Sequence, residues 1–195
     1  MISLIDYNAG NIASVANALT KLNVDFVITQ DLSVIQNSDK IILPGVGEAS
    51  SAMNKLKERN LVYTLMTTKI PLLGICLGMQ LFCQFTEEGN TDCFGIIPSK
   101  AKIFDKNKVK VPQIGWNQVK VIKKSNLLMN IKDSEYFYFA NSYYIPINEF
   151  TIASSIYGAE FSSIIEKDNF FGVQFHPEKS GELGLKILNN FVKLC

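Results

Sequence analysis

Residues 70–75 form an apolar, strand-like run, residues 78–85 form a helix-compatible stretch, and the Gly-x-Cys-x-Gly turn at residues 74–78 joins them. In this elbow pattern, Cys76 is the nucleophile and Gly74 and Gly78 flank it. Glycine permits the sharp reversal, and the thiol projects above the N-terminus of the next helix, which favours the thiolate. The alternative is a structural Cys76, because a free cysteine also behaves as a small apolar side chain.

A second apolar run, at residues 170–175, leads directly into His176, Pro177 and Glu178. The run predicts a buried strand, and the proline prevents a helix from continuing through the histidine. In an extended chain His176 and Glu178 lie on one side, so the carboxylate can orient the imidazole while the other ring nitrogen faces a thiol. His176 is the only histidine in the sequence, so no other imidazole can activate Cys76. The alternative is a solvated His-Pro-Glu turn.

Strand-like and helix-like segments alternate in the N-terminal part of the chain. Residues 2–5 predict a strand, and apolar residues then recur at helical spacing. Residues 26–28 and 40–43 predict two more strands, separated by a polar stretch of helix length. This alternation predicts an α/β fold with a parallel sheet. Reactive groups gather at the carboxyl ends of parallel strands, so the loop after residue 43, Cys76 and His176 are expected at one edge.

The loop Pro44-Gly45-Val46-Gly47 is a candidate source of oxyanion stabilisation. A thiolate that attacks an amide generates an oxyanion, and each backbone N–H that stabilises it is worth about 10² to 10³ in rate. The N–H of Leu77 is one natural donor. The N–H of Val46 is the expected second donor, because the glycines on both sides permit peptide orientations that bulky residues forbid. The alternative is an ordinary turn between a strand and a helix.

The middle of the chain, residues 100–144, changes to shorter strand-like pieces. The pieces at 108–111, 117–121 and 136–139 predict a mixed or antiparallel extension of the sheet. Apolar residues at three- and four-residue spacing predict a core helix over 183–194. No repeat or long linker interrupts the sequence, so residues 1–195 are expected to form a single domain.

Composition agrees with a small cytoplasmic enzyme. The 195 residues are 47% hydrophobic with a formal charge of +1, which favours neither nucleic-acid nor membrane binding. The longest apolar runs are far shorter than the ~20 residues of a spanning helix, and we expect no signal peptide. The four cysteines lack Cys-x-x-Cys spacing and accompany a single histidine. We therefore expect free thiols and neither a metal nor another cofactor.

With these motifs the chain resembles class I, triad-type glutamine amidotransferases from Asp6 to the last helix. The elbow and the His176-Pro177-Glu178 run carry the likeness to the class. Further motifs are similar to those of the glutaminase subunits of imidazole glycerol phosphate synthases. They are Asp6-Tyr7 with Gly10-Asn11, Pro44-Gly45-Val46-Gly47, Pro112-Gln113-Ile114-Gly115-Trp116-Asn117, and His176-Pro177-Glu178-Lys179-Ser180.

This resemblance implies a three-layer, flavodoxin-like α/β fold: a mostly parallel open sheet with helices on both faces and a small antiparallel extension. It also implies that Cys76 attacks the side-chain amide of L-glutamine, forming a glutamyl thioester and releasing ammonia. His176 would protonate the leaving amine, and Glu178 would orient His176. The residues that the resemblance implies as glutamine contacts are Gly47, Gln80, Ser142 and Tyr143.

A partner is expected because a glutaminase domain over the whole chain leaves no room for a synthase domain. The resemblance implies a heterodimer in which a cyclase subunit uses the ammonia to make imidazole glycerol phosphate and AICAR in histidine biosynthesis. It also implies a docking segment that includes Pro112, Gly115, Trp116 and Asn117. An exposed Trp116 would be a rigid aromatic anchor, and the alternative is a core tryptophan.

One position departs from the family, because relatives commonly carry a histidine where this chain has Asn141. The position is outside the triad, so the glutaminase chemistry is expected to survive. Asn141 leaves open a paralogue that supplies ammonia to a different synthase, as in amination or amidination of surface sugars. The triad alone would also suit a cysteine peptidase or amidase, and a catalytically silent regulatory subunit is a third alternative.

Overall fold

The computed structural model describes residues 1–7 and 11–195, so Gly10 of the N-terminal motif lies outside the described residues. The helices are α1 (Ile12–Lys21), α2 (Leu32–Gln36), α3 (Ala49–Glu58), α4 (Leu61–Thr67), α5 (Leu77–Gln80) and α6 (Gly181–Leu194), with short 3₁₀ turns η1 (Glu88–Asn90), η2 (Asn126–Leu128) and η3 (Pro177–Lys179). The strands are β1 (Ile2–Ile5), β2 (Phe26–Thr29), β3 (Lys40–Gly45), β4 (Leu72–Cys76), β5 (Cys83–Thr86), β6 (Thr91–Asp92), β7 (Ile97–Ile103), β8 (Gln113–Val121), β9 (Glu135–Asn141), β10 (Tyr143–Tyr144), β11 (Thr151–Ile156), β12 (Glu160–Lys167) and β13 (Phe170–Val173).

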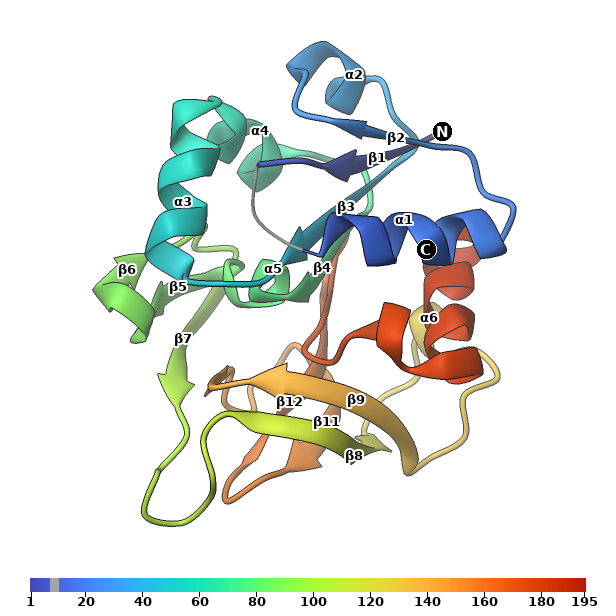
Figure 1. Cartoon of the computed structure of the whole chain (residues 1–195). Coiled ribbons are helices and arrows are strands. Elements are labelled where there is room, and N and C mark those ends of the chain that lie inside the picture. Colours follow the sequence, from blue (N-terminus) through green and yellow to red (C-terminus); the bar gives the residue numbers. More distant parts are fainter. Residues whose placement is uncertain (8–10) are drawn as a thin grey trace.

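A nine-stranded sheet organises the molecule, in the order β2-β1-β3-β4-β13-β12-β11-β8-β9 (Figure 1). The first five strands in this order pair in parallel, and the last four continue the sheet with antiparallel pairs. The α/β class predicted from the sequence is confirmed. The antiparallel extension was predicted from residues 100–144. It also includes the hairpin of β11 and β12, which lies outside that stretch.

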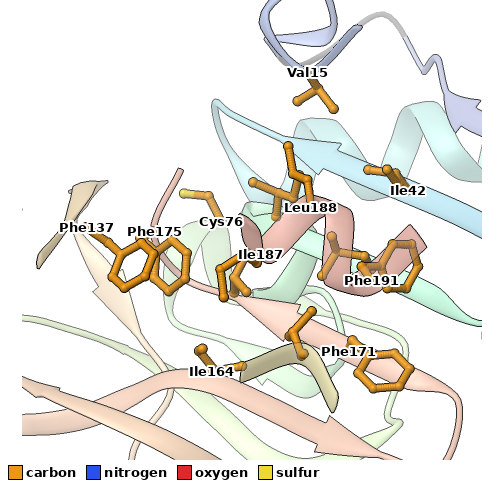
Figure 2. Packing of buried hydrophobic residues seen from close by; sticks show 14 of the residues in the cluster. Val15, Ile42, Cys76, Phe137, Ile164, Phe171, Phe175, Ile187, Leu188 and Phe191 are labelled. Atoms are coloured by element: carbon orange, nitrogen blue, oxygen red, sulfur yellow. The ribbon is translucent and has the colours of Figure 1, made fainter. Parts of the chain in front are cut away.

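Helices cover both faces of the parallel strands. Neighbouring residues of one strand point to opposite faces, and accordingly Leu4 packs with α1 and α6 whereas Ile5 packs with α3 and α4. Figure 2 shows the first of these two cores, where Ile187 and Leu188 of α6 approach the sheet. Each fully buried leucine or isoleucine contributes roughly 1.5–3 kcal/mol to the free energy of unfolding. Buried apolar contacts on both faces therefore stabilise the parallel part of the sheet.

Two local predictions were wrong. The helix expected over residues 78–85 ends at Gln80, and β5 follows it in a four-stranded sheet, β10-β7-β5-β6. Pairing of β5 with β7 overrides the local helical pattern. The strand expected over 108–111 is instead part of a turn, because the Asp105 carbonyl accepts hydrogen bonds from the N–H groups of Lys108 and Val109. The core helix expected over 183–194 is present and begins at Gly181.

Three neighbouring strands end at the same edge of the sheet. Gly45 at the end of β3 lies opposite Cys76 at the end of β4, and Ile75 lies opposite Val173 at the end of β13. The loop after Gly45, the cysteine and the chain leading to His176 therefore meet there, as expected for parallel strands. Within the described residues, no helix combines the length and the apolarity that crossing a membrane requires.

Candidate active site

Cys76 has a backbone conformation that few side chains adopt. It has a φ of 54° and a ψ of −108°, and as the last residue of β4 it is also the N-cap of the four-residue helix α5. A positive φ strains a residue that has a Cβ, and such strain persists only where the surrounding structure enforces it. The side chain is nearly buried, at 6% exposure. The strand-to-helix junction thus holds one thiol at the carboxyl edge of the sheet.

Three glycines enforce this conformation through direct backbone contact. A Cβ built on Gly78 would lie 2.1 Å from the Leu43 carbonyl oxygen, and one on Gly74 would lie 2.6 Å from the Gly78 carbonyl. A Cβ on Gly45 would lie 2.5 Å from the Gly78 nitrogen. The backbone of α5 therefore rests on β3 and β4 with no side chain between them. Only glycine permits this approach.

His176 and Glu178 are buried together behind the thiol. Nδ1 of His176 lies 2.9 Å from Oε1 of Glu178, and their side chains are 3% and 1% exposed. The backbone of His176 is also fixed, because its N–H donates to the Tyr138 carbonyl at 2.8 Å and its carbonyl accepts from the Ser180 hydroxyl at 2.7 Å. The backbone of His176 is thus held by β9 and by the turn before α6, and Glu178 holds the ring.

The environment of His176 favours its protonated form. Burial alone lowers the pKa of the imidazole, but hydrogen bonding and charge from Cys76, followed by those from Glu178, raise it to about 10. An opposite charge within a few ångströms stabilises the charged form of a base. The arrangement therefore supports a thiolate paired with an imidazolium, which is a nucleophile next to a proton donor.

A cavity of about 220 Å³ opens onto Cys76. It is smaller than the ~300–1,000 Å³ of sites for drug-sized ligands, so it suits a small metabolite. The oxyanion and glutamine residues expected from the sequence all line it together with the thiol. The lining residues are Val46, Gly47, Cys76, Leu77, Gln80, Glu88, Pro112, Ile114, Ala140, Asn141, Ser142 and Tyr143.

The loop that carries Val46 is anchored by Tyr7, which the sequence interpretation did not assign to the site. The Tyr7 hydroxyl donates a hydrogen bond to the Pro44 carbonyl at 2.9 Å. Burial, and after it the charge of Cys76, raises the pKa of Tyr7, so this phenol remains a donor. Val46 and Gly47 are exposed beyond this anchor, and Gly47 has a φ of +94° that suits glycine.

Glu88 was also missed by the sequence interpretation. It lines the cavity, and its Oε2 accepts a hydrogen bond from the N–H of Ala49 at 3.0 Å. Burial raises the pKa of Glu88. Burial, and then the charges of Glu88, Glu87 and Glu48, raise the pKa of Tyr143, which lines the same cavity as Glu88. Only the folded chain reveals this acidic side, because the Glu87-Glu88 pair resembles an ordinary solvated charge pair in the sequence.

Asn141 and Gln80 line the same cavity and share one hydrogen-bond acceptor. The Nδ2 of Asn141 and the Nε2 of Gln80 both donate to the Tyr143 carbonyl, each at 2.9 Å. Asn141 is 5% exposed, and its Oδ1 is buried without a hydrogen-bond partner among the described residues. The asparagine therefore supports the segment from Ser142 to Tyr143, between β9 and β10.

The expected docking segment lies on β8 and at its start. Trp116 is 57% exposed, so the core-tryptophan alternative is wrong. Its indole meets the Tyr138 ring edge to face with 6.2 Å between centroids, and the Lys179 ammonium lies 5.8 Å from the centre of the same ring. Pro112 is exposed at the cavity, Gly115 has a φ of +136°, and Asn117 donates to the Ile156 carbonyl at 3.0 Å. Asn117 thus braces the strand whereas Trp116 faces solvent.

The donor set at the site does not suggest a metal. Across residues 1–7 and 11–195, no group of three or more His, Cys, Asp or Glu side chains could hold an ion. All four cysteines are free, as expected from their spacing.

A family model described as "Glutamine amidotransferase class-I" matches residues 3–195. Solved structures share the fold: a glutamine amidotransferase from Thermotoga maritima has a TM-score of 0.63 at 17% identity, covering 96% of this chain and 79% of that one. PurLQS from the same organism has a TM-score of 0.70 at 17% identity, covering 98% and 96%.

Relatives found by sequence have higher identity to this chain than these solved structures, over a similar length. "Imidazole glycerol phosphate synthase subunit HisH" from Bacteroides fragilis is 48% identical over 195 residues, which are 99% of both chains. The proteins of that name from Buchnera aphidicola and Haemophilus influenzae are each 45% identical, covering 99% of both chains and 98% and 96%, respectively. The chain belongs to the class-I glutamine amidotransferases and, within them, to the HisH family.

Proposed function

We propose that this chain is the glutaminase subunit of an imidazole glycerol phosphate synthase. It hydrolyses L-glutamine to L-glutamate and ammonia in histidine biosynthesis, and residues 1–195 act as one amidotransferase domain. The observation that carries the chemistry is the Cys76 elbow, opening into a small cavity and backed by the His176–Glu178 pair at 2.9 Å. The family membership carries the pathway.

In the proposed reaction the Cys76 thiolate attacks the side-chain amide carbon of glutamine. The N–H groups of Leu77 and Val46 would stabilise the oxyanion, and both residues line the cavity next to the sulfur. Collapse of this intermediate breaks the C–N bond, and His176 gives its proton to the departing nitrogen. Water then adds to the thioester with His176 as the base, releasing glutamate and restoring the thiolate.

The cavity offers complementary groups to the two charges of the amino acid. Glu88 and the carbonyl oxygen of Gln80 suit the α-ammonium, because both N–H donors of Gln80 are already used within the protein. Ser142, Tyr143 and the Gly47 backbone lie on the same cavity and suit the α-carboxylate. This distribution favours a zwitterionic amino acid over a peptide, in which the backbone amides carry no such charges.

The proposed acceptor of the ammonia is a cyclase subunit that forms a heterodimer with this chain. Ile114 is 67% exposed and lines the cavity, and Trp116 follows two residues later on the same face of β8. An apolar surface therefore continues from the cavity mouth along the strand. A partner docked there would cover the mouth and receive ammonia before water protonates it.

The proposal is tested by glutamate release from L-glutamine, with the chain alone and mixed with the cyclase subunit of the same organism and its nucleotide substrate. We expect stimulation by the complete mixture and no release by Cys76→Ala. The Cys76→Ala complex should still make imidazole glycerol phosphate from added ammonium salts. Cys76-dependent release without stimulation would indicate another synthase, and release that survives Cys76→Ala would refute the mechanism.

A further inference from the structure

Gln174 is a buried amide with no part in the reaction described above. It follows β13, two residues before His176, and it is 0% exposed. Its backbone N–H donates to the Ser163 carbonyl on β12 at 2.8 Å. Its side chain extends to the active edge, where Nε2 lies 3.6 Å from the sulfur of Cys76 and Oε1 lies 2.9 Å from Nε2 of Gln80.

The Tyr143 carbonyl determines the direction of the hydrogen bonds that link Gln80, Gln174 and Cys76. The Tyr143 oxygen can only accept, so the group of Gln80 that lies 2.9 Å from it is the NH₂. The other hydrogen of that NH₂ points to Gln174, which must therefore present its oxygen. The NH₂ of Gln174 is left facing the sulfur of Cys76. The hydrogen-bond partners of Gln174 thus fix which way its amide points.

A donor at this position favours negative charge on sulfur. Hydrogen bonds to an ionised acceptor are about twice as strong as those between neutral groups. The titratable groups that face Cys76 are His176, with Glu178 behind it, and Tyr7 from the chain after β1. Glu88 lies across the cavity. Gln174 does not titrate, so its effect on the thiolate persists at every pH.

We propose that Gln174 is a positioning residue that stabilises the Cys76 thiolate through its NH₂ and, through its oxygen, fixes Gln80 in the substrate-binding wall. The sulfur and the wall are then joined by one hydrogen-bonded chain that runs Tyr143, Gln80, Gln174, Cys76. A substrate bound to the Gln80 oxygen is thereby held in a fixed position relative to the Cys76 sulfur. This inference rests on the proposed function for its substrate, whereas its effect on the thiol is independent of glutamine.

The first test is Gln174→Met, which keeps the length of the side chain and removes both hydrogen bonds. We expect kcat for glutamine hydrolysis to fall about 10- to 100-fold, as for loss of a bond to a charged group. Peptide mass spectrometry measures the rate of Cys76 alkylation by iodoacetamide from pH 5 to 9. In the variant, this rate should reach half its maximum about one pH unit higher than in the wild-type chain. Gln84→Met, the same change at an exposed glutamine of β5, is the matched control and should leave both unchanged.

Background alkylation is small in this pH range. Burial raises the pKa of Cys93 to about 12 and that of Cys195 to about 11, and burial also raises the pKa of Cys83. These thiols remain protonated below pH 9, and thiols react as thiolates. Cys76→Ala gives the residual rate to subtract.

Gln174→Glu separates the proposed role from general packing. A carboxylate keeps an acceptor for Gln80 but cannot donate to sulfur, so the loss of kcat should deepen as pH rises and the new carboxyl ionises. A packing role alone would give a loss that does not depend on pH. This variant also decides the question if Gln174→Met does not fold.

The link to Gln80 is measured by a double-mutant cycle. Gln80→Met should lower kcat/KM less in the Gln174→Met background than in the wild-type chain, because the connecting bond is already absent. A folded Gln174→Met chain with the wild-type alkylation profile and kcat within twofold of wild type would overturn the inference. If the wild-type chain hydrolysed no glutamine even with the cyclase, the proposed function would fail, and the alkylation profile would still decide the role of Gln174.

Discussion

The parallel and antiparallel halves of the central sheet differ in how their faces are covered. In the parallel half, β2-β1-β3-β4-β13 is covered by helices on both faces, and glycine backbone contacts hold α5 against β3 and β4 directly after the nucleophile. In the antiparallel half, the β8–β9 ribbon buries Phe137 and Phe139 on one face and exposes Trp116 and Tyr136 on the other. The parallel half can hold a strained residue because closely packed backbone around it enforces the conformation. The open ribbon leaves apolar side chains free to meet another surface.

One glycine substitution in each half of the sheet tests this difference in packing. Gly78→Ala should destabilise the fold by about 3 kcal/mol or more, because its Cβ would meet the Leu43 carbonyl oxygen at 2.1 Å. Gly115→Ala in β8 meets nothing within 4 Å and adds only the strain of a φ of +136°, about 1–2 kcal/mol. Urea unfolding of both variants measures the difference. Equal losses would mean that the parallel half is no more rigid than the ribbon.

His176 connects the two halves, because it follows β13 and its N–H donates to the Tyr138 carbonyl on β9. Its raised pKa, about 10 in the folded chain against 6.5 for the ordinary side chain, means that protonation stabilises the fold. This contribution is complete below pH 6.5 and is lost as pH rises through about 10. Cys76→Ala removes the largest raising influence, so the midpoint should fall. The single imidazole resonance in the NMR spectrum reports it, and an unmoved midpoint would contradict the contact between Cys76 and His176.

The ribbon should contribute more to assembly than to folding. Trp116→Ala should weaken the complex with the cyclase subunit by about 2–4 kcal/mol, as for a central aromatic anchor, and should change the melting temperature little because the indole is 57% exposed. Tyr63→Ala, at a 77% exposed ring on α4, is the control and should bind normally. Calorimetric titration gives the affinity. An unchanged affinity with a lowered melting temperature would assign Trp116 to folding instead.

The smallest expected effect is at the anchor of the oxyanion loop. Tyr7→Phe removes the hydrogen bond to the Pro44 carbonyl, which leads into the loop that carries Val46. The loss of one neutral hydrogen bond is worth about 0.5–1.5 kcal/mol, so kcat should fall about two- to tenfold while KM changes less. Steady-state kinetics with the cyclase present measures this. A larger rise in KM than fall in kcat would mean that Tyr7 shapes the substrate pocket rather than the oxyanion loop.

The sequence predicted local elements better than features that depend on distant partners. The elbow around Cys76 and the alternation of strands and helices are local patterns, and each can be recognised without its neighbours. The end of α5 at Gln80 and the turn at Asp105 depend on partners distant in the sequence or on one carbonyl, and both were mispredicted. Glu88 was missed for the same reason, since only the fold brings it to the cavity. Gln174 belongs to an apolar, strand-like run in the sequence, although its amide turns toward Cys76 in the fold.

Trp116 is the only tryptophan in the sequence, and its exposure has a spectroscopic consequence. An indole in water emits at longer wavelengths than an indole in a protein interior, so the folded free chain should already emit like a solvated indole. Unfolding would therefore shift the emission little, whereas a partner that covered the ribbon would shift it to shorter wavelengths. The emission wavelength of Trp116 would then change on assembly with a partner and change little on folding.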